Sequence, residues 1–316
     1  MGALVVADKL RVALFGSPGF ALPVLKMLYE HGQVVLVVTQ PDKPVGRGLE
    51  LRSPPLAAAA KESGLRLEQP ARLKKNDAFH ELVESLNLDV AITTAYGKIL
   101  PQSLLDLPEH GFLNVHASLL PKYRGAAQIQ WALINGETET GVSIMQTEAG
   151  LDTGPVRHMA RLAIAPEDTA LTLFDKLANL GAAALAEGLE LLAACRLPCQ
   201  PQDATEATVA PLLTKEDGEV RWTDTAEAVV NRYRGVIAWP GTWTRFGERV
   251  LKIHNLSVAE GGGAPGTVLK VAKEGVTVAT GGGAVILTSV QPPNKAKMPA
   301  YDWANGYHVK EGDKLG

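Results

Sequence analysis

Short apolar runs alternate with amphipathic stretches over the first 115 residues of the chain. The apolar runs are typical of strands buried on both faces of a parallel sheet, and the amphipathic stretches have the period of a helix. The expected strands are residues 11–16, 33–39, 88–95 and 112–116, and the expected helices are 20–32, 53–64 (with Ser53 as its N-cap) and 77–87. Strands that alternate with helices predict an α/β fold with a doubly wound sheet.

A long helical pattern at residues 170–196 closes the first domain, which we place at residues 1–194. Residues 195–209 are rich in proline and threonine and lack periodicity, so we interpret them as a linker. Residues 210–316 contain short β-rich segments that glycines interrupt. This spacing is typical of a small antiparallel barrel or sandwich.

Composition narrows the class of protein. The 316 residues are 46% hydrophobic and 21% charged, and the net charge of -3 gives no global electrostatic reason to bind nucleic acid. Cys195 and Cys199 lack histidines at metal-ligand spacing, so we expect reduced thiols and no metal site. The N-terminus lacks the pattern of a signal peptide, and no apolar stretch approaches the roughly 20 residues of a membrane span. We therefore expect a cytoplasmic protein with no membrane partner.

The glycine turn after the first expected strand, FGSPGF, does not match a dinucleotide-binding fingerprint, because Pro18 stands where the second glycine should be. We interpret it as an ordinary tight turn. The chain also lacks a Walker motif, a G-x-S-x-G elbow and an H-E-x-x-H helix. Nucleotide-binding, serine-hydrolase and zincin chemistries are therefore disfavoured.

The segment FLNVHASLLP, residues 112–121, carries the first chemical signal. Side chains two apart in a strand point the same way, so Asn114 and His116 share one face. Asp152 lies in AGLDTGP, where glycines favour a turn that presents its carboxylate. An amide, an imidazole and a carboxylate suit acyl transfer to an amine, because the amide can stabilise an oxyanion and the imidazole can donate or move protons. A buried, hydrogen-bonded histidine beside a structural asparagine would explain the same pattern, and sequence separation alone does not show that Asp152 meets His116.

The motif N-x-H-x-S-L-L-P at residues 114–121, followed by Arg124-Gly125 and by G-L-D-T-G at 150–154, resembles the signature of the 10-formyltetrahydrofolate-dependent formyltransferases. The resemblance implies a Rossmann-like formyltransferase domain followed by a small OB-like β-barrel, at residues 210–316. It also implies that Asn114 and His116 donate hydrogen bonds to the oxyanion. It implies that Asp152 pairs with His116 and helps to pass a proton through water to the leaving folate, and that no metal is required.

The resemblance further implies where 10-formyltetrahydrofolate, the formyl donor, would bind. The segment TTAYGKILP lines the pterin pocket of relatives through backbone contacts, and the loop after the catalytic strand shapes the rest of the folate site. The expected folate-binding residues are Ala95, Tyr96, Gly97, Ser118, Leu119, Leu120 and Pro121.

TQPDKPVGRG, residues 39–48, resembles a loop that the tRNA-acting branch of the family inserts after its second strand. The resemblance implies that Arg47 contacts the acceptor stem, with Lys43 as a second cation, whereas Leu49 and Glu50 stand where relatives often place lysines. A mobile surface loop would be the alternative for this segment alone. The C-terminal candidates for tRNA binding are Arg245, Arg249, Lys252, Lys295 and Lys297.

An unbroken strand would place Arg245 and Arg249 on one face, although a solvated barrel surface explains each cation as well. The step Trp239-Pro240 also matches the family, and we expect Trp239 and Trp243 to pack in the barrel core.

The activity that the resemblance implies is formyl transfer to the α-amine of methionine on initiator tRNA, by a monomer. Two alternatives stay open. A 4-amino sugar nucleotide could be the acceptor, since enzymes that formylate such sugars share the core and a C-terminal barrel. The chain could also bind folate or tRNA without turnover, although all three catalytic residue types are present.

Overall fold

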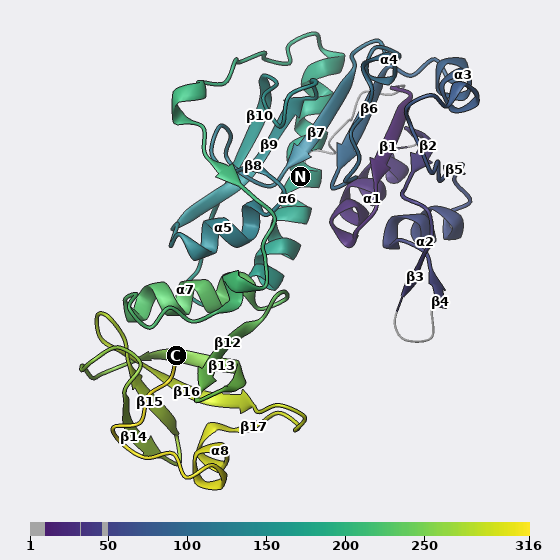
Figure 1. Ribbon diagram of the computed structural model, residues 1–316. Coiled ribbons are helices and arrows are strands. Elements are labelled where there is room, and N and C mark those ends of the chain that lie inside the picture. Colours follow the sequence, from purple (N-terminus) through teal and green to yellow (C-terminus); the bar gives the residue numbers. More distant parts are fainter. Residues whose placement is uncertain (1–9, 32, 46–49) are drawn as a thin grey trace. The chain divides into compact units, whose positions relative to one another are not determined.

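The computed structural model describes residues 10–31, 33–45 and 50–316 (Figure 1). The chain forms two compact units that do not follow simple sequence order. The first contains the residues up to Gly125, Glu139–Ala163 and Phe174–Val209, and the second contains Ala126–Thr138, Ile164–Leu173 and Ala210–Gly316. The sequence indicated the large C-terminal segment but not the two shorter segments that join it. The exact bounds of a linker at 195–209 stay a prediction.

The first unit is built on a seven-stranded sheet with the order β10-β9-β7-β6-β1-β2-β5. Its strands are β1 (Val12–Gly16), β2 (Val34–Val38), β5 (Leu67–Glu68), β6 (Val90–Thr94), β7 (Phe112–His116), β9 (Glu139–Gln146) and β10 (Val156–Ala163). Five neighbouring strands, from β7 to β5, are parallel, while β9 and β10 add an antiparallel edge. The predicted parallel α/β sheet is therefore confirmed.

Helices cover both faces of this sheet. They are α1 (Leu22–Glu30), α2 (Pro55–Glu62), α3 (Asp77–Ser85), α4 (Gln102–Leu105) and α6 (Ala170–Ala193), and the short elements of the unit are η1 (Gly19–Ala21), β8 (Arg124–Gly125) and η2 (Ala204–Glu206). On one face, Phe15 and Phe112 pack with Phe79 of α3 and Leu104 of α4. On the other face, α6 passes so close to the sheet that a Cβ on Gly181 would lie 2.8 Å from Val115. This two-sided burial explains the continuous apolar strands.

A small hairpin, β3 (Lys43–Val45) paired with β4 (Glu50–Arg52), follows β2. Its base is held by Asp42, whose carboxylate accepts hydrogen bonds from Gln69 and from Ser53. The expected N-cap role of Ser53 is wrong, because its hydroxyl is turned to Asp42 and the residue before α2 is Pro54, which has no side-chain donor or acceptor. Arg47 and Leu49 lie outside the described residues, and Glu50 begins β4.

The second unit contains an antiparallel β domain, as predicted. Its strands run in the order β12-β13-β16-β15-β14, and β17 pairs with β16. They are β12 (Thr242–Phe246), β13 (Arg249–Ala259), β14 (Val268–Ala272), β15 (Gly275–Ala279), β16 (Ala284–Gln291) and β17 (Met298–Pro299); the remaining elements are α5 (Gln128–Ile134), β11 (Val209–Ala210), η3 (Glu216–Gly218), α7 (Ala226–Val236) and α8 (Ala300–Gly306).

The two early segments join this unit through α7. Ile134 of α5 packs with Leu213 and with Val236 of α7. One guanidinium nitrogen of Arg234 donates to the carbonyls of Ala165, Pro166 and Asp168. Apolar contacts and hydrogen bonds between residues far apart in sequence therefore attach these two segments to the second unit. The local sequence pattern does not predict such contacts.

Two expectations about the β domain are wrong. Gly247 has φ +57° and turns the chain between β12 and β13, so Arg245 and Arg249 lie on different strands. Trp239 is 52% exposed, and Trp243 is only partly buried and donates to the carbonyl of Lys215. The tryptophans of the core are instead Trp222 and Trp303.

Among the helices of the described residues, none is long and apolar enough to cross a membrane.

Candidate active site

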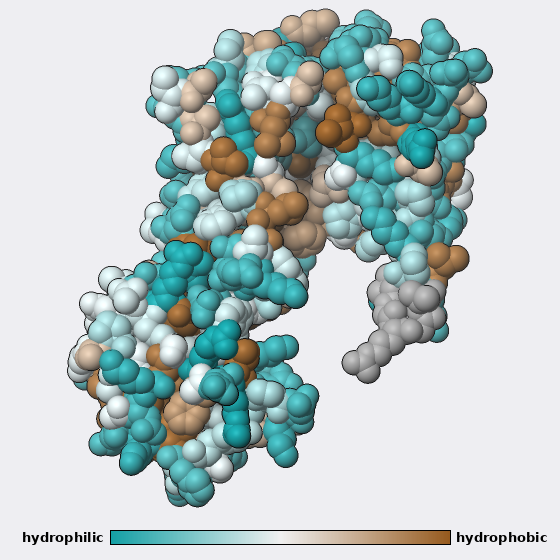
Figure 2. All heavy atoms as spheres, in the orientation of Figure 1, coloured by the Kyte–Doolittle hydropathy of each residue, from teal (hydrophilic) through white to brown (hydrophobic). Residues whose placement is uncertain are grey.

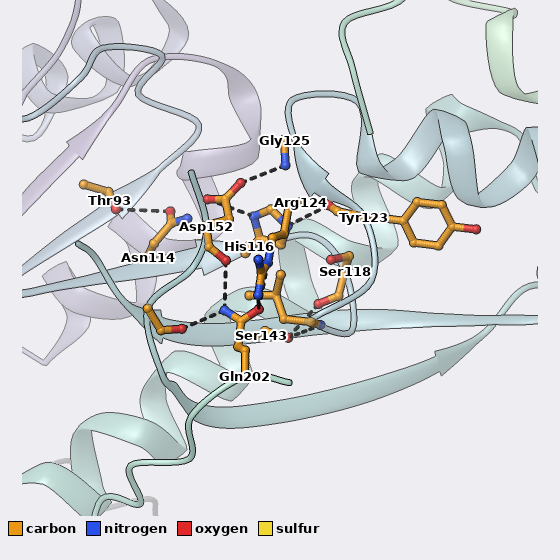
Figure 3. Close-up of polar contacts among 12 residues, drawn as sticks. Thr93, Asn114, His116, Ser118, Tyr123, Arg124, Gly125, Ser143, Asp152 and Gln202 are labelled. Atoms are coloured by element: carbon orange, nitrogen blue, oxygen red, sulfur yellow. Dashed lines mark hydrogen bonds and ion pairs between the residues drawn. The ribbon is translucent and has the colours of Figure 1, made fainter. Parts of the chain in front are cut away.

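The register of the sheet pairs Asn114, two residues before the end of β7, with Thr93 near the carboxyl end of β6. The Thr93 hydroxyl donates to the side-chain oxygen of Asn114 at 3.1 Å. The side-chain oxygen of Asn114 faces Thr93, so the NH₂ group is turned away from that hydroxyl and remains available as a donor. Figure 3 shows that nitrogen on the side of Asp152. The structure thus presents an oriented amide donor where parallel sheets commonly bind ligands.

His116 ends β7, and its ring is 2% exposed. Its Nε2 lies 3.0 Å from the carbonyl oxygen of Tyr123. A carbonyl can only accept a hydrogen bond, so Nε2 carries a proton and Nδ1 of the neutral ring presents a lone pair. Burial lowers the pKa of His116, although the Asp152 carboxylate and the bond to Tyr123 act in the opposite direction. The ring is therefore neutral near pH 7, with Nδ1 as a proton acceptor.

The carboxylate of Asp152 lies beside that nitrogen. Its Oδ1 is 3.7 Å from Nδ1 of His116, too long for a direct hydrogen bond but close enough for charge to act on the ring. Its Oδ2 accepts the backbone N–H of Gly125 at 2.8 Å. Asp152 has φ +50°, and a Cβ on Gly154 would lie 2.0 Å from the carbonyl oxygen of Gln146, so only glycine allows this turn to close.

Asn114, His116 and Asp152, which the sequence singled out, therefore lie together at the carboxyl end of β7 (Figure 3). Asp152 comes from a turn about 36 residues further along the chain than His116. They combine an oriented amide donor, a neutral imidazole and a carboxylate that would stabilise the charged imidazole. This set of groups can bind a developing oxyanion and can take a proton from an attacking amine. The arrangement is that of a transfer site for an acyl or formyl group.

Comparison with known proteins agrees with this chemistry. Residues 10–189 match the family model "Formyl transferase", and residues 212–308 match "Formyl transferase, C-terminal domain". The chain belongs to the formyl transferase family. It is 54% identical to the Methionyl-tRNA formyltransferase of Deinococcus radiodurans, over 96% of this chain and 95% of the relative. It is 47% identical to that of Thermus thermophilus, over 97% and 99%.

A solved formyltransferase structure shares the fold at much lower identity. It is an N-formyltransferase from Helicobacter canadensis in complex with folinic acid and dTDP-3-aminofucose, which is 16% identical, has a TM-score of 0.68, and is matched over 90% of this chain and 99% of its own. The enzymatic class, a formyltransferase, is thus shown for this chain by its family.

In this formyltransferase, the loop after β7 is braced from within. Ser118 is buried and its hydroxyl donates to the carbonyl of Lys122. The Ser143 hydroxyl, which stands beside His116 in the register, donates to the carbonyl of Ser118 and accepts from the N–H of Leu120. Leu120 is buried, whereas Leu119 and Pro121 are partly exposed. Ser118 and Leu120 therefore shape the loop, and Leu119 and Pro121 are the members of the predicted folate set that can face a ligand here.

The second predicted folate segment is a turn after β6. Ala95 and Gly97 have φ of +48° and +71° and are exposed, while the Tyr96 ring is buried. The side-chain amide of Gln40 donates to the carbonyl of Tyr96 at 2.8 Å, and a Cβ on Gly97 would lie 3.0 Å from that amide. The residues on either side of Tyr96 are small and exposed, which fits recognition of a flat polar ring through peptide groups. That role stays a prediction.

The predicted tRNA-binding cations lie on different strands and loops and do not share one face of the β domain. Arg245 and Lys252 share the outer face of the β12–β13 hairpin around Trp243, with the Arg245 guanidinium 5.8 Å from the indole ring centre. Arg249 belongs to the other face and lies over Tyr307. The remaining candidates, Lys295 and Lys297, are exposed between β16 and β17, and Lys43 is exposed in β3, where it donates to Gln40. Figure 2 shows mainly hydrophilic residues on the visible face of the β domain.

The sequence did not indicate the residues that hold the candidate catalytic groups in place. They are Thr93, Tyr123, Ser143 and Gln202. No short motif marks them, because each becomes relevant only through the register or through contacts across the fold. A weak signal existed for Thr93, which follows from pairing the ends of the expected strands. Within the described residues, no group of three or more His, Cys, Asp and Glu could hold a metal ion, and a metal-free reaction stays a prediction.

Proposed function

We propose that this protein transfers the formyl group of 10-formyltetrahydrofolate to the α-amine of methionyl initiator tRNA, which gives formyl-methionyl-tRNA for translation initiation. The observation that carries the choice of acceptor is the 54% identity to a Methionyl-tRNA formyltransferase over nearly the whole length of both chains. The sugar N-formyltransferase likeness, at 16% identity, supports the shared fold alone.

A folate donor is supported by the family and by the folinic acid in the Helicobacter canadensis relative. In this chain the proposed folate residues are the turn Ala95–Gly97 and the loop Ser118–Pro121. They flank Asn114 at the ends of adjacent strands β6 and β7, which is the position expected for a formyl group between the folate and the catalytic side chains.

We propose the following catalytic roles for Asn114, His116 and Asp152, which the geometry of the site supports. The neutral amine attacks the formyl carbon, and a C–N bond forms while the carbonyl electrons move to oxygen. The Asn114 amide donates to that oxyanion. His116 accepts the amine proton on Nδ1, and Asp152 stabilises the imidazolium that results.

Collapse of the intermediate breaks the bond between the formyl carbon and N10 of the folate. The proton that His116 now carries on Nδ1 can bond the oxyanion and then pass to N10, directly or through water. The amine proton is thereby transferred to the leaving folate, and no other reactant is needed. This sequence needs a neutral His116 at the start, which agrees with the lowered pKa of the buried ring.

Recognition of the tRNA is proposed for two sets of cations. Lys43 and Arg47 belong to the segment around the β3–β4 hairpin, and Arg245, Arg249, Lys252, Lys295 and Lys297 belong to the β domain. Lysine and arginine side chains suit phosphate contacts, which position a nucleic acid without reading its sequence. A role in translation initiation would place the protein in the cytoplasm, and a monomer is expected.

The test is a formylation assay with three acceptors. Purified protein and 10-formyltetrahydrofolate are mixed with initiator Met-tRNA, elongator Met-tRNA or a 4-amino sugar nucleotide, and the formylated product is measured. The proposal predicts rapid formylation of the initiator and little of the other two. Turnover of the sugar with neither tRNA formylated would show that the acceptor is wrong, and binding of folate without any turnover would show that the chain is not catalytic.

A further inference from the structure

Gln202, in the segment after α6, bridges the two loops that carry the catalytic groups. Its amide nitrogen donates to the carbonyls of Asp152 at 2.8 Å and Gly154 at 2.7 Å. Its amide oxygen accepts from Nε and Nη2 of Arg124, at 3.0 and 2.8 Å. Figure 3 shows the side chain between the Asp152 turn and Arg124.

All four hydrogen-bonding positions of this amide are filled, and the partners fix its orientation. Carbonyls only accept and a guanidinium only donates, so the NH₂ group must face the Asp152 turn and the oxygen must face Arg124. A carboxylate of the same shape could bind Arg124 but would oppose the two carbonyls. An aliphatic side chain would leave all of these groups without the bonds to Gln202.

The two loops must meet for the catalytic pair to form. His116 and Gly125 flank the loop after β7, whereas Asp152 lies in the turn between β9 and β10. The Asp152 carboxylate contacts both sides of that loop, through the Gly125 N–H and through the His116 ring. Gln202 bonds the backbone of the Asp152 turn and the side chain of Arg124, the residue before Gly125. One side chain therefore holds both partners of the hydrogen bond between Gly125 and Asp152.

The chain that carries Gln202 is itself anchored. Gln200 pairs with Val156 through two backbone hydrogen bonds, 2.8 and 2.9 Å, at the start of β10. Further along, the Thr208 hydroxyl accepts the N–H of Tyr123, the residue whose carbonyl holds His116. A segment expected to be a plain linker is thus fixed against the catalytic loops on both sides of Gln202.

We propose that Gln202 is a positioning residue for catalysis, which holds the Asp152 carboxylate against His116. The inference rests on the proposed function for its kinetic consequences but not for its structural ones. Gln202→Ala should lower kcat by about 10- to 100-fold, because a displacement of about 1 Å at a catalytic group can cost that much. The KM for tRNA should stay within about threefold of wild type, because Gln202 contacts no proposed tRNA residue.

Two companion variants separate positioning from other roles. Gln202→Glu keeps the bonds to Arg124 and loses the donors to the Asp152 turn, so it should be as slow as Gln202→Ala; near-normal kcat in Gln202→Glu would overturn the proposal. Gln200→Ala, a change in an exposed side chain of the same segment, is the matched control and should retain wild-type kcat.

A double-mutant cycle tests whether Gln202 acts through Asp152. In an Asp152→Asn background, Gln202→Ala should cost less than about threefold, since residues that act as a unit are not additive. An undiminished cost of Gln202→Ala in that background would contradict the proposal.

Hydrogen–deuterium exchange gives a readout that does not depend on turnover. Amides of residues 147–156 and of Gly125 should exchange faster in Gln202→Ala than in wild type or Gln200→Ala. Unchanged exchange would refute the positioning role even if the wild-type protein failed to formylate Met-tRNA. Conversely, faster exchange with an inactive wild type would uphold Gln202 and refute the proposed function.

Discussion

The proposed catalytic site at the carboxyl end of β7 and the exposed face of the β12–β13 hairpin use polar residues in opposite ways. At the proposed catalytic site, the His116 ring is 2% exposed, the Asp152 side chain is 16% exposed, and both have fixed hydrogen-bond partners. On the β domain, Arg245 and Lys252 are exposed, and the Arg245 guanidinium lies over the ring of Trp243.

This difference teaches where single substitutions should matter. Buried polar groups with one allowed geometry give large losses when one is removed, because the partners left behind are unsatisfied. Exposed cations act through screened charge, and each contributes little by itself. The first set should therefore control the chemical step, and the second should control the affinity for a polyanion.

The largest effect is expected at Asn114. Asn114→Ala removes the proposed oxyanion donor and should lower kcat by about 100- to 1000-fold, with little change in KM for either substrate. Steady-state formylation kinetics provide the measurement. Thr93→Val, which keeps the amide but loses the hydroxyl that orients it, should give a smaller loss of about 3- to 10-fold. Near-normal kcat in Asn114→Ala would remove this residue from the mechanism.

Asp152→Asn should lower kcat by about 100-fold and also change the pH profile. In the wild type, kcat/KM should fall as the pH drops through the pKa of His116, which burial holds below its usual value of 6.5. The Asp152 carboxylate raises that pKa, so its removal should move the fall to lower pH. Asp302→Asn, the same change on α8, should leave the profile unmoved. An unshifted profile in Asp152→Asn would mean that the carboxylate does not act on His116.

Gly154→Ala tests the packing of the turn. The new Cβ would lie 2.0 Å from the carbonyl oxygen of Gln146, so the turn must move, at a cost of about 1–3 kcal/mol in the free energy of unfolding. Denaturant titration measures this cost. Gly262→Ala is the matched control, because a Cβ there meets nothing within 4 Å. Equal stability of the two variants would show that the turn tolerates displacement.

The smallest effects are expected on the β domain. The double variant Arg245→Ala, Lys252→Ala should raise the KM for tRNA by about 3- to 10-fold and leave kcat unchanged. The slope of log kcat/KM against log salt concentration should become shallower by about 1–2, because one or two phosphate contacts are lost. Lys270→Ala removes a charge from β14, at the opposite edge of the sheet, and should change neither. A variant that lost kcat instead of affinity would break the contrast between the two regions.

The sequence predicted what depends on local pattern. Continuous apolar strands indicated the parallel sheet, and alternation placed Asn114 and His116 on one face. It gave only a weak indication that Thr93 meets Asn114, because that bond depends on which strands are neighbours in the sheet. Gln202 was invisible for a stronger reason, since a glutamine in an aperiodic segment has no local signal and its partners lie about 50 and 78 residues away.

The errors have the same physical origin. Ser53 was expected as an N-cap because it precedes an apolar helix, but the Asp42 carboxylate competes successfully for its hydroxyl. Arg245 and Arg249 were placed on one face by alternation along an unbroken strand, whereas Gly247 between them adopts a positive φ and turns the chain into a hairpin. In both cases an interaction across the chain, or a backbone choice open to glycine, overrides the local pattern.

The most direct test of the account is a single-turnover assay with the enzyme in excess over charged initiator tRNA and with saturating 10-formyltetrahydrofolate, because this separates binding from chemistry. We expect the wild type to formylate the tRNA, and Asn114→Ala to be slower by about 100-fold or more at every enzyme concentration. The Arg245→Ala, Lys252→Ala double variant should regain the wild-type rate once its concentration saturates the tRNA. A wild-type rate in Asn114→Ala, or a double variant that stays slow at saturation, would contradict the account.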